Sequence, residues 1–524
     1  MKKNISNIDL KNPKNWVLSK IICSQYKQHP DFEIIEFTNG QKWTYKKMYT
    51  LALKASNYIN ELGVKKEESI TVMVDCPKKF IPLWLGAALL GVKFTAINTS
   101  LRGDVLAHQI KLATPKAIFV ETNYYNEISK VDINKTNIKI VNIDLLILKK
   151  KIDEELISES KNYDVSCIMF TSGTSGPSKG VIMPNSHCVL FAIGTIENYN
   201  LKKNDKFYIC LPLFHANGLF MQLLACLINK NKAIIRERFS ATNWLKDIIK
   251  YKATHTNMLG AIASFIVSQP PTDYDKKHNL KLIGSAPLPK EPEKILRKRF
   301  GVKHVVPLYG MTEINIPLYG VLSEQGNGTC GKVYKKYFEV EIWNPETDEK
   351  VNDGEIGEIV VRPKISFAFM QGYIGMPAES FNSYRNFWFH TGDAGIVNET
   401  GHFIFVDRIK DCIRRRGENI SSYEVEQAFL KFPEIIEAAA FGVPARDSGM
   451  EEEVMVALLV INGANLKYKK WIEEARKNLA SFSVPKYIRI MSNFPKTSTG
   501  KIQKHLLKKE GVTPNTWKND DRDK

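Results

Sequence analysis

The stretch TSGTSGPSKG, Thr171 to Gly180, follows directly after the apolar run SCIMF, Ser166 to Phe170. The apolar run predicts a buried strand, so the glycine- and hydroxyl-rich stretch is predicted to be the loop that leaves it. Three glycines let backbone N–H groups approach a ligand closely, and five hydroxyl side chains and Lys179 add donors that suit phosphate oxygens. The P-loop spacing G-x-x-x-x-G-K-[ST] occurs nowhere in the chain. The sequence therefore predicts a phosphate-binding loop of another kind.

Apolar runs alternate with helical stretches on both sides of this loop. Near-continuous apolar strands of this kind are typical of parallel sheets that helices cover on both faces. The longest apolar stretch, Phe80 to Ile97, is interrupted by proline, glycine and lysine, and it predicts a buried helix that runs into a strand rather than a membrane span. The other predicted strands are SITVMVD (Ser69 to Asp75), KAIFVE (Lys116 to Glu121), IKIVNI (Ile138 to Ile143) and KFYICLPL (Lys206 to Leu213).

The pattern changes after about Gly331. The runs FEVEIWN, Phe338 to Asn344, and GEIGEIVVR, Gly354 to Arg362, predict strands separated by Pro, Asn, Asp and Gly turns, which is typical of antiparallel structure. We therefore expect an α/β fold. It has a large N-terminal domain, residues 1–408, made of doubly wound α/β subdomains and a β-barrel-like subdomain, and a small mobile C-terminal α+β domain, residues 409–524.

The start of the small domain carries a helix signal. Ser421 and Glu424 form a capping box, in which the serine hydroxyl accepts from a backbone N–H of the first helical turn. The box predicts a helix over Tyr423 to Phe432. The charged stretch IKDCIRRRG that precedes it is expected to link the two domains.

Composition excludes several classes of protein. The 524 residues are 44% hydrophobic, which excludes global disorder, collagen and a membrane bundle. Lys and Arg number 74 and Asp and Glu 56, a net charge of +18, but the lysines are scattered, which favours solvated faces over a nucleic-acid site. The eight cysteines form no CxxC pair, and the N-terminus has no apolar signal region. We expect a reduced, cytoplasmic protein without nucleic-acid binding or stable membrane association.

Eight further motifs follow the loop in order. Together with the loop they resemble the adenylate-forming superfamily, which includes acyl-CoA synthetases, firefly luciferase and adenylation domains of nonribosomal peptide synthetases. The resemblance spans Trp43 to Lys504. AINTSLRGDVLAHQI (Ala96 to Ile110) and DRIKDCIRRRGENISS (Asp407 to Ser422) look most like the crotonobetaine/carnitine-CoA ligase branch. The motifs are LPLFHANG (Leu211 to Gly218), GSAPLP (Gly284 to Pro289), YGMTE (Tyr309 to Glu313), GEIGEIVVR, WFHTGD (Trp388 to Asp393), VDRIKD (Val406 to Asp411), RRRGENISSYEVE (Arg414 to Glu426) and PKTSTGKIQK (Pro495 to Lys504).

The resemblance implies an AMP-forming carboxylate:CoA ligase. ATP and a small-molecule carboxylate would give an acyl-adenylate and pyrophosphate, and the CoA thiol would then take the acyl group, with Mg²⁺ bound to the nucleotide. Carnitine, crotonobetaine or another short acid is the implied substrate. The alternative is an adenylation enzyme that loads a carrier-protein thiol. Monomer and homodimer both remain open.

The resemblance also implies the site residues. Lys501 would bridge the reacting carboxylate and the α-phosphate, Glu313 would bind Mg²⁺, and Thr171 and His215 complete the catalytic set. Lys410 would be the hinge between two orientations of the small domain. The implied nucleotide-binding residues are Thr171, Ser172, Gly173, Thr174, Ser175, Gly176, Lys179, Ser285, Ala286, Tyr309, Gly310, Met311, Thr312, Asp393 and Arg408. Arg415, Gly417 and Glu418 would face CoA, although a solvated basic turn is an equal alternative for Arg414 to Arg416. The implied acyl pocket is His215, Asn217, Gly218, Gly260, Ser285, Gly310 and Ile314, and Trp388, Phe214 or Tyr319 would be able to cage a cationic substrate.

Overall fold

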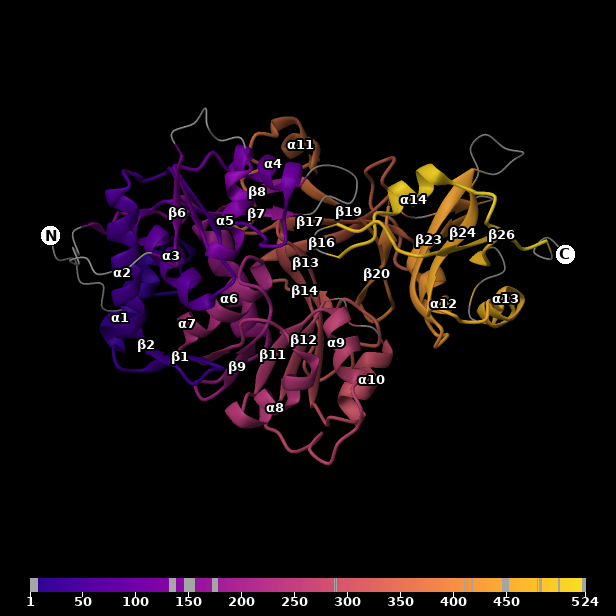
Figure 1. Ribbon diagram of the computed structural model, residues 1–524, viewed down its shortest axis with the longest axis horizontal. Helices are drawn as coiled ribbons and strands as arrows, with labels where there is room; N and C mark the ends of the chain where they lie inside the picture. The colour runs from indigo at the N-terminus through magenta and orange to yellow at the C-terminus, as the bar shows by residue number, and fades with distance from the viewer. Residues whose placement is uncertain are drawn as a thin grey trace.

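The structure is a computed structural model in which a large domain and a small C-terminal domain lie side by side (Figure 1). It describes residues 8–131, 138–145, 156–171, 178–286, 288, 290–409, 411, 413–415, 418–444, 452–477, 479, 483–497 and 500–520. Among the predicted site residues, Ser172 to Gly176, Lys410 and Gly417 lie outside these ranges. Within the described residues, no helix has the length and apolar character needed to cross a bilayer.

A six-stranded sheet carries the predicted phosphate-binding loop. Its strands are parallel except for β8, which forms an antiparallel hairpin with β7, so the loop joins two neighbouring strands. The sheet order is β6 (Lys139–Asn142), β5 (Ala117–Val120), β3 (Ser69–Met73), β4 (Lys93–Ala96), β7 (Val165–Thr171) and β8 (Lys179–Pro184). The accompanying helices are α2 (Tyr45–Glu61), α3 (Pro77–Leu90), α4 (Gly103–Ala113) and α5 (Thr122–Ser129).

The buried stretch around α3 folds as its sequence predicts. The helix ends at Gly91, whose φ of 69° is in the left-handed region that glycine adopts at little cost. The chain then enters β4. The prediction of a buried helix that runs into a strand is confirmed.

A nine-stranded sheet forms the second α/β layer of the large domain. Its central strands are parallel, and only its two ends are antiparallel. The order is β15 (Lys332–Val333), β14 (Asn315–Tyr319), β13 (His304–Met311), β12 (Leu282–Ser285), β11 (His255–Met258), β9 (Lys206–Ile209), β10 (Lys232–Ile235), β1 (Glu33–Phe37) and β2 (Lys42–Thr44). The accompanying helices are α1 (Leu18–Gln28), α6 (Asn185–Asn198), the π-helix η3 (Asn217–Leu224), α7 (Ala225–Asn229), α8 (Ala241–Tyr251), α9 (Gly260–Val267) and α10 (Lys290–Lys298).

Aromatic side chains from three helices join the two layers in one core. Trp84 of α3 lies 6.3 Å from Phe220 of η3, ring centre to ring centre, and Phe220 stacks on Phe191 of α6 at 6.1 Å. All three side chains are fully buried. The two sheets therefore hold a fixed position relative to each other, which fixes the site between them.

An antiparallel sheet follows and leads into the small domain. It consists of β16 (Phe338–Trp343), β17 (Gly357–Pro363), β19 (Trp388–Val397) and β18 (Tyr384–Arg385), with β20 (Phe403–Arg408) paired to β19 and helix α11 (Pro377–Asn382) beside it. The small domain contains the hairpin β21 (Ile413–Arg415) and β22 (Glu418–Ile420), and a four-stranded sheet of β23 (Ile435–Pro444), β24 (Glu452–Val460), β25 (Tyr487–Met491) and β26 (Trp517–Lys518). Its helices are α12 (Ser422–Phe429), α13 (Tyr468–Arg476) and α14 (Lys504–Glu510).

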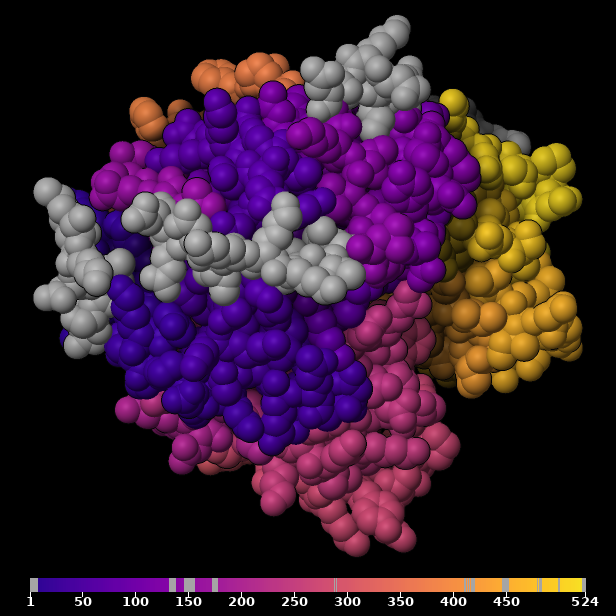
Figure 2. Space-filling model, turned by 60° about the vertical axis from the view of Figure 1, so that its left-hand side comes forward, coloured from indigo at the N-terminus to yellow at the C-terminus, as the bar shows by residue number. Residues whose placement is uncertain are grey.

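The small domain packs against one side of the large domain (Figure 2). Its first helix has the predicted cap, because the Ser421 hydroxyl accepts from the Glu424 backbone N–H at 3.2 Å. The α/β class, the mixed sheets of the large domain and the small α+β domain confirm the fold expected from the sequence.

Candidate active site

Four neighbouring parallel strands, β9, β11, β12 and β13, end at the same edge of the nine-stranded sheet. Open α/β sheets bind their ligands at this carboxyl edge. The implied acyl-pocket residues come from the ends of these strands or from the segments that follow them: His215, Asn217 and Gly218 after β9, Gly260 after β11, Ser285 at the end of β12, and Gly310 and Ile314 at and after the end of β13. The topology therefore gathers them along one edge.

Glu313 is a buried carboxylate, 4% exposed, in the connection between β13 and β14. The Tyr373 hydroxyl donates to its Oε1 at 3.0 Å, and the Met370 N–H donates to its backbone carbonyl at 3.0 Å. Burial raises the pKa of Glu313, while the Tyr373 hydrogen bond and the positive charges of Arg408 and Lys179 oppose that rise. A carboxylate is thus held in one position beside two cations.

The predicted phosphate-binding loop is anchored beside this carboxylate. Thr171 and Lys179 face each other across the β7–β8 hairpin, and the Thr171 hydroxyl donates to the Lys179 carbonyl at 3.4 Å. The Lys179 ammonium lies 4.8 Å from the centre of the Tyr373 ring, a cation–π contact. Because Tyr373 also binds Glu313, the base of the loop and the carboxylate share one aromatic side chain.

Asp393 is a second buried carboxylate, 2% exposed, on β19. The Tyr309 hydroxyl donates to its Oδ2 at 2.8 Å, and burial raises its pKa while Arg408 lowers it. Arg408 Nε lies 2.8 Å from Oδ1, close enough for an ion pair, but the direction of approach does not make a hydrogen bond, so Oδ1 has no hydrogen-bond partner among the described residues. A buried oxygen is therefore left as an acceptor for a hydroxyl donor.

The turn before Asp393 is held by a residue that the sequence did not identify. Glu358 Oε1 accepts from the Gly392 N–H at 2.8 Å, and its Oε2 lies 2.7 Å from His390 Nδ1. Glu358 and His390 are both buried. Glu358 belongs to the predicted strand GEIGEIVVR, and the pairing of β17 with β19 brings it to this turn.

His187 is a second residue that sequence reasoning missed. Its ring is fully buried between two carbonyl oxygens, with Nε2 2.8 Å from Thr312 O and Nδ1 2.6 Å from Ala368 O. Burial lowers its pKa to about 4, although both carbonyls act in the opposite direction. His187 thereby ties Thr312, a predicted nucleotide contact, to the segment that leads to Tyr373. No local motif around His187 predicts this contact, because its partners lie more than 100 residues away in the chain.

Position 310 has room only for glycine. A Cβ at this position would lie 2.1 Å from the Asn315 carbonyl oxygen. The close approach folds the chain sharply between β13 and β14, and the two strands pair with an irregular register at Tyr309 and Met311. The turn presents Thr312 and Glu313 at the strand end.

Lys501 lies in a tight turn of the small domain. Lys496 and Ile502 pair across the turn, the Thr497 N–H donates to the Lys501 carbonyl at 2.7 Å, and the Lys501 N–H donates to Thr497 Oγ1 at 3.1 Å. Gly500 has a φ of 82°, in the left-handed region. Backbone bonds within the turn thus set the direction of the lysine.

Charged groups of the large domain act on the Lys501 ammonium. Burial and Arg408 lower the pKa of Lys501, and Asp393 and Glu313 raise it. The side chain as a whole is exposed, yet protein atoms around its ammonium still displace enough water to lower the pKa. Burial, with a smaller effect of Lys501, also lowers the pKa of His215 to about 4. The structure therefore brings together Lys501, Glu313, Asp393, Arg408 and His215.

The expected acyl pocket borders a buried polar network. Asn217 Oδ1 accepts from Gln222 Nε2 at 3.1 Å and from Asn257 Nδ2 at 2.9 Å. The Tyr199 hydroxyl donates to Asn257 Oδ1 at 2.8 Å, and it lies only 1.8 Å from where a Cβ of Gly284 would be. Tyr199 therefore fills the space beside β12, next to Ser285.

Two expectations from the sequence are corrected. Arg415 is not a surface residue that faces CoA: it is 4% exposed, and its Nε lies 2.9 Å from Glu453 Oε2, because β21 packs on β24 inside the small domain. Trp388 is not free to cage a cationic substrate. Its ring lies 5.4 Å from that of Trp343, and the Arg362 guanidinium already lies over it at 4.6 Å.

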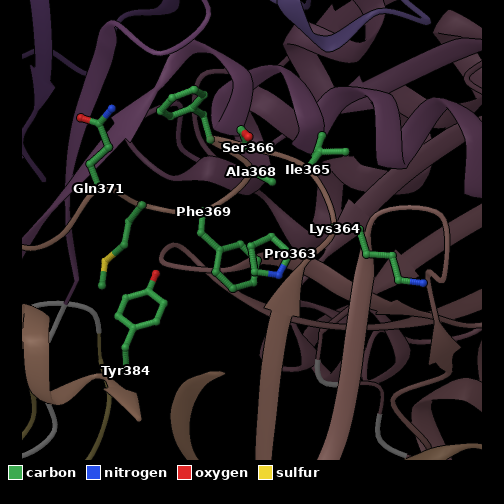
Figure 3. A pocket seen from close by; sticks show the side chains of 10 residues that line it. Pro363, Lys364, Ile365, Ser366, Ala368, Phe369, Gln371 and Tyr384 are labelled. Atoms are coloured by element: carbon green, nitrogen blue, oxygen red, sulfur yellow. The ribbon is translucent and has the colours of Figure 1, made fainter. Parts of the chain in front are cut away.

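A cavity of about 460 Å³ borders the segment that contacts Glu313 and His187, because Met370 and Ala368 are among its lining residues. The segment 363–371 and Tyr384 line it, and Figure 3 shows Lys364 and Gln371 on opposite sides, pointing away from Phe369 and Pro363. No predicted site residue is among its lining residues. We therefore do not assign the active site to this cavity.

Comparison with known proteins agrees with this geometry. Residues 23–374 match the family model described as AMP-binding enzyme, and residues 424–501 match the AMP-binding enzyme C-terminal domain. The chain is 25% identical to long-chain fatty acid transport protein 1 of Mus musculus, over 93% of this chain and 81% of that protein. It is also 25% identical to crotonobetaine/carnitine–CoA ligase of Escherichia coli, over 92% and 96% of the two chains.

A solved structure shows the same fold. O-succinylbenzoate CoA synthetase (MenE) of Bacillus subtilis, in complex with ATP and magnesium ion, superimposes with a TM-score of 0.82 at 21% identity, over 93% of this chain and 99% of that one. The relatives carry different substrate names, so the crotonobetaine/carnitine branch is one of several similar branches. With its family model spanning more than half of its length, the chain belongs to the AMP-binding enzyme family, among the AMP-forming acid–CoA ligases.

Proposed function

We propose that this chain joins a carboxylic acid to the α-phosphate of ATP, releases pyrophosphate, and then transfers the acyl group from the adenylate to the thiol of CoA. One observation carries the proposal most strongly. The charges of Asp393, Arg408 and Glu313 in the large domain act on the Lys501 ammonium of the small domain. A cation is needed there because both reacting groups are anions, and a positioned charge stabilises their approach.

The residues present fit a nucleotide. Asp393 Oδ1 is buried and accepts no hydrogen bond from the described residues, so a ribose hydroxyl would satisfy it, with Arg408 beside it. Tyr309, Ser285 and Ala286 would frame the adenine. Lys179 and the loop from Thr171 would hold the outer phosphates, and Thr312 would contact the α-phosphate.

Glu313 fits Mg²⁺ held jointly with ATP. No group of three or more His, Cys, Asp or Glu side chains within the described ranges is placed to hold a metal ion by itself. Mg²⁺ in nucleotide sites commonly takes one or two carboxylates together with phosphate oxygens and water. When bound, the ion neutralises phosphate charge, and Glu313 would fix its place on the protein.

The substrate would be a short, polar acid such as a carnitine-like or crotonobetaine-like carboxylate. Tyr199 occupies the space beside β12 and would limit the depth of the acyl pocket. Asn217 and Asn257 supply polar groups next to Tyr199. His215 would lie at the end of the acyl pocket that holds the substrate carboxylate. Its low pKa keeps the ring uncharged at neutral pH, so it adds no charge that competes with Lys501 for the carboxylate.

The second half-reaction needs a different arrangement of the small domain. Lys501 and the CoA thiol would both have to reach the reacting acyl group, so the domain, residues 409–524, would turn about Lys410 after adenylate formation. Gly417 and Glu418 would then face CoA. A few hinge residues suffice for such a turn.

A product assay over a panel of acids tests the proposal. The panel contains carnitine, crotonobetaine, short and medium fatty acids and aryl acids, each with ATP, Mg²⁺ and CoA. We expect AMP, pyrophosphate and acyl-CoA in equal amounts with at least one short polar acid, and none without Mg²⁺. ADP and phosphate in place of AMP and pyrophosphate, or no product with any acid, would contradict the proposed function.

A further inference from the structure

Among the residues that the structure describes, two hydrogen bonds tie the start of helix α12 to the end of strand β20. Val406 and Asp407 are the residues of β20 that precede Arg408, and Ser421 and Ser422 begin α12 on the other side of the junction. The Ser422 N–H donates to Asp407 Oδ2 at 2.6 Å, and the Ser421 hydroxyl donates to the Val406 carbonyl at 2.7 Å. The large domain thus holds the start of the first helix of the small domain.

These bonds are shielded from water. Asp407 and Ser421 are each 4% exposed, and Ser422 is fully buried. Asp407 also accepts from the Arg408 N–H at 2.7 Å through Oδ1. A carboxylate at a helix N-terminus satisfies a free N–H and interacts favourably with the helix dipole, so Asp407 acts as a cap that comes from the other domain.

The helix α12 is in turn tied to the segment that carries Lys501. Lys504, three residues after Lys501, places its ammonium 2.6 Å from Glu426 Oε1 and also hydrogen-bonds the Ser422 hydroxyl. Burial alone would lower the pKa of Lys504, but Glu426 and Asp407 raise it above its ordinary value. Because these bonds lie within the small domain, α12 and the Lys501 turn move together.

The two sets of bonds differ in what a rotation of the small domain does to them. The Lys504 bonds join groups on the same side of Lys410 and survive a rotation about it. The bonds of Asp407 and Val406 join groups on opposite sides, so a rotation breaks them. They exist only in the orientation in which Lys501 lies beside Asp393.

We propose that Asp407 and Ser421 are positioning residues, which hold the small domain in the orientation for adenylate formation and thereby set the balance between the two half-reactions. The inference rests on the proposed function and on rotation about Lys410. It assigns to this pair no contact with ATP, acid or CoA. They act through Lys501, which they keep at the nucleotide site.

Ser421→Asp separates this role from simple helix capping. Aspartate is a good N-cap and still accepts from the Glu424 N–H, but it has no proton to donate to the Val406 carbonyl and adds repulsion toward Asp407. Ser421→Thr keeps both the donor and the acceptor and is the matched control. Asp407→Ala removes the other bond between β20 and α12 and serves as an independent second variant.

Single-turnover rates of the two half-reactions are the first measurement. From the usual net value of a hydrogen bond, Ser421→Asp and Asp407→Ala should each slow acyl-adenylate formation by about two- to tenfold, while thioester formation from supplied acyl-adenylate is unchanged or faster. Ser421→Thr should match the wild type in both steps. Equal slowing of both half-reactions, or no slowing of either, would overturn the proposal.

A distance measurement tests the inference without any reaction. Tyr274 in the large domain and Ile461 in the small domain are exposed sites, 60% and 49%, suited to nitroxide labels. Pulsed EPR should show a second distance population that grows in Ser421→Asp and not in Ser421→Thr. Unchanged distributions in both variants would refute the positioning role, whereas failure of every acid in the product assay would refute only the proposed reaction.

Discussion

The two halves of the candidate site are built differently. In the large domain, Glu313 and Asp393 are less than 5% exposed, and tyrosine hydroxyls from other parts of the fold hold both carboxylates. In the small domain, Lys501 is exposed, and a turn of adjacent residues alone sets its direction. Buried carboxylates that are hydrogen-bonded to distant parts of the fold cannot move independently of the large domain. A side chain on a short turn moves with its whole domain.

This difference suits a reaction in two steps. The nucleotide must be held through both steps, so its carboxylates belong in the rigid domain. The lysine is needed while the carboxylate and the α-phosphate combine, and it must leave before the thiol arrives. Substitutions in each domain should therefore affect different steps of the reaction.

Glu313→Gln should slow pyrophosphate release on the order of a thousandfold. Glutamine keeps the shape and can still accept from the Tyr373 hydroxyl, but it loses the charge that would bind Mg²⁺. Initial rates over a Mg²⁺ titration measure the loss, and thermal unfolding serves as the control for folding. A variant with wild-type rates and normal Mg²⁺ dependence would remove Glu313 from the site.

Lys501→Ala should slow acyl-adenylate formation by about a hundredfold or more, because one positioned donor at a developing charge is worth that much. Thioester formation from supplied acyl-adenylate should stay near the wild-type rate. Lys496→Ala, which removes a lysine paired with Glu437 in the same turn, is the matched control. Comparable losses in both half-reactions would mean that Lys501 is not confined to the first step.

Lys410→Pro should have the opposite effect on the two steps. Proline fixes φ near −65° and restricts the residue before it, so the small domain would be trapped in one orientation. Thioester formation from supplied acyl-adenylate should fall at least about tenfold, as expected for loss of a required rotation, with adenylate formation less affected. Single-turnover rates of each step provide the comparison, and a variant with both steps intact would place the hinge elsewhere.

Acid should weaken the large domain through His187. Its pKa is about 4 in the folded state and 6.5 in the unfolded state, so between these values only the unfolded chain takes up the proton, and stability falls as the pH falls. Between pH 7 and pH 5 this residue should cost about 2 kcal/mol of unfolding free energy. The difference between wild type and His187→Gln in urea unfolding at the two pH values measures that share. If the two proteins lose equal stability on acidification, the His187 ring is not buried in its neutral form.

Local patterns in the sequence predicted the strands, the buried helix α3 and the serine cap of α12, because each depends on residues that are neighbours in the chain. The cap illustrates the limit of such patterns. Ser421 was identified from its spacing to Glu424, but its bond to Val406 depends on how β20 meets α12, which no spacing reveals.

Arg415 shows the same limit of local patterns, because there the pattern gave a wrong prediction. Three successive arginines predict an exposed basic turn, yet Arg415 is buried against Glu453, 38 residues later in the chain. The hairpin β21–β22 and its packing on β24 decide which arginine faces inward. The carboxylates Glu313 and Asp393 were found only because their motifs occur together in a family, and His187 and Glu358 were missed because they act through contacts distant in sequence.

Oxygen transfer tests the proposed chemistry most directly. If the carboxylate attacks the α-phosphorus of ATP and the thiol then takes the acyl group, one carboxylate oxygen stays on the phosphorus. With the best acid of the panel labelled with ¹⁸O in its carboxyl group, mass spectrometry should find one ¹⁸O in each AMP and none in pyrophosphate. Unlabelled AMP, or label in inorganic phosphate alongside ADP, would contradict an acyl-adenylate intermediate and with it the roles assigned to the two domains.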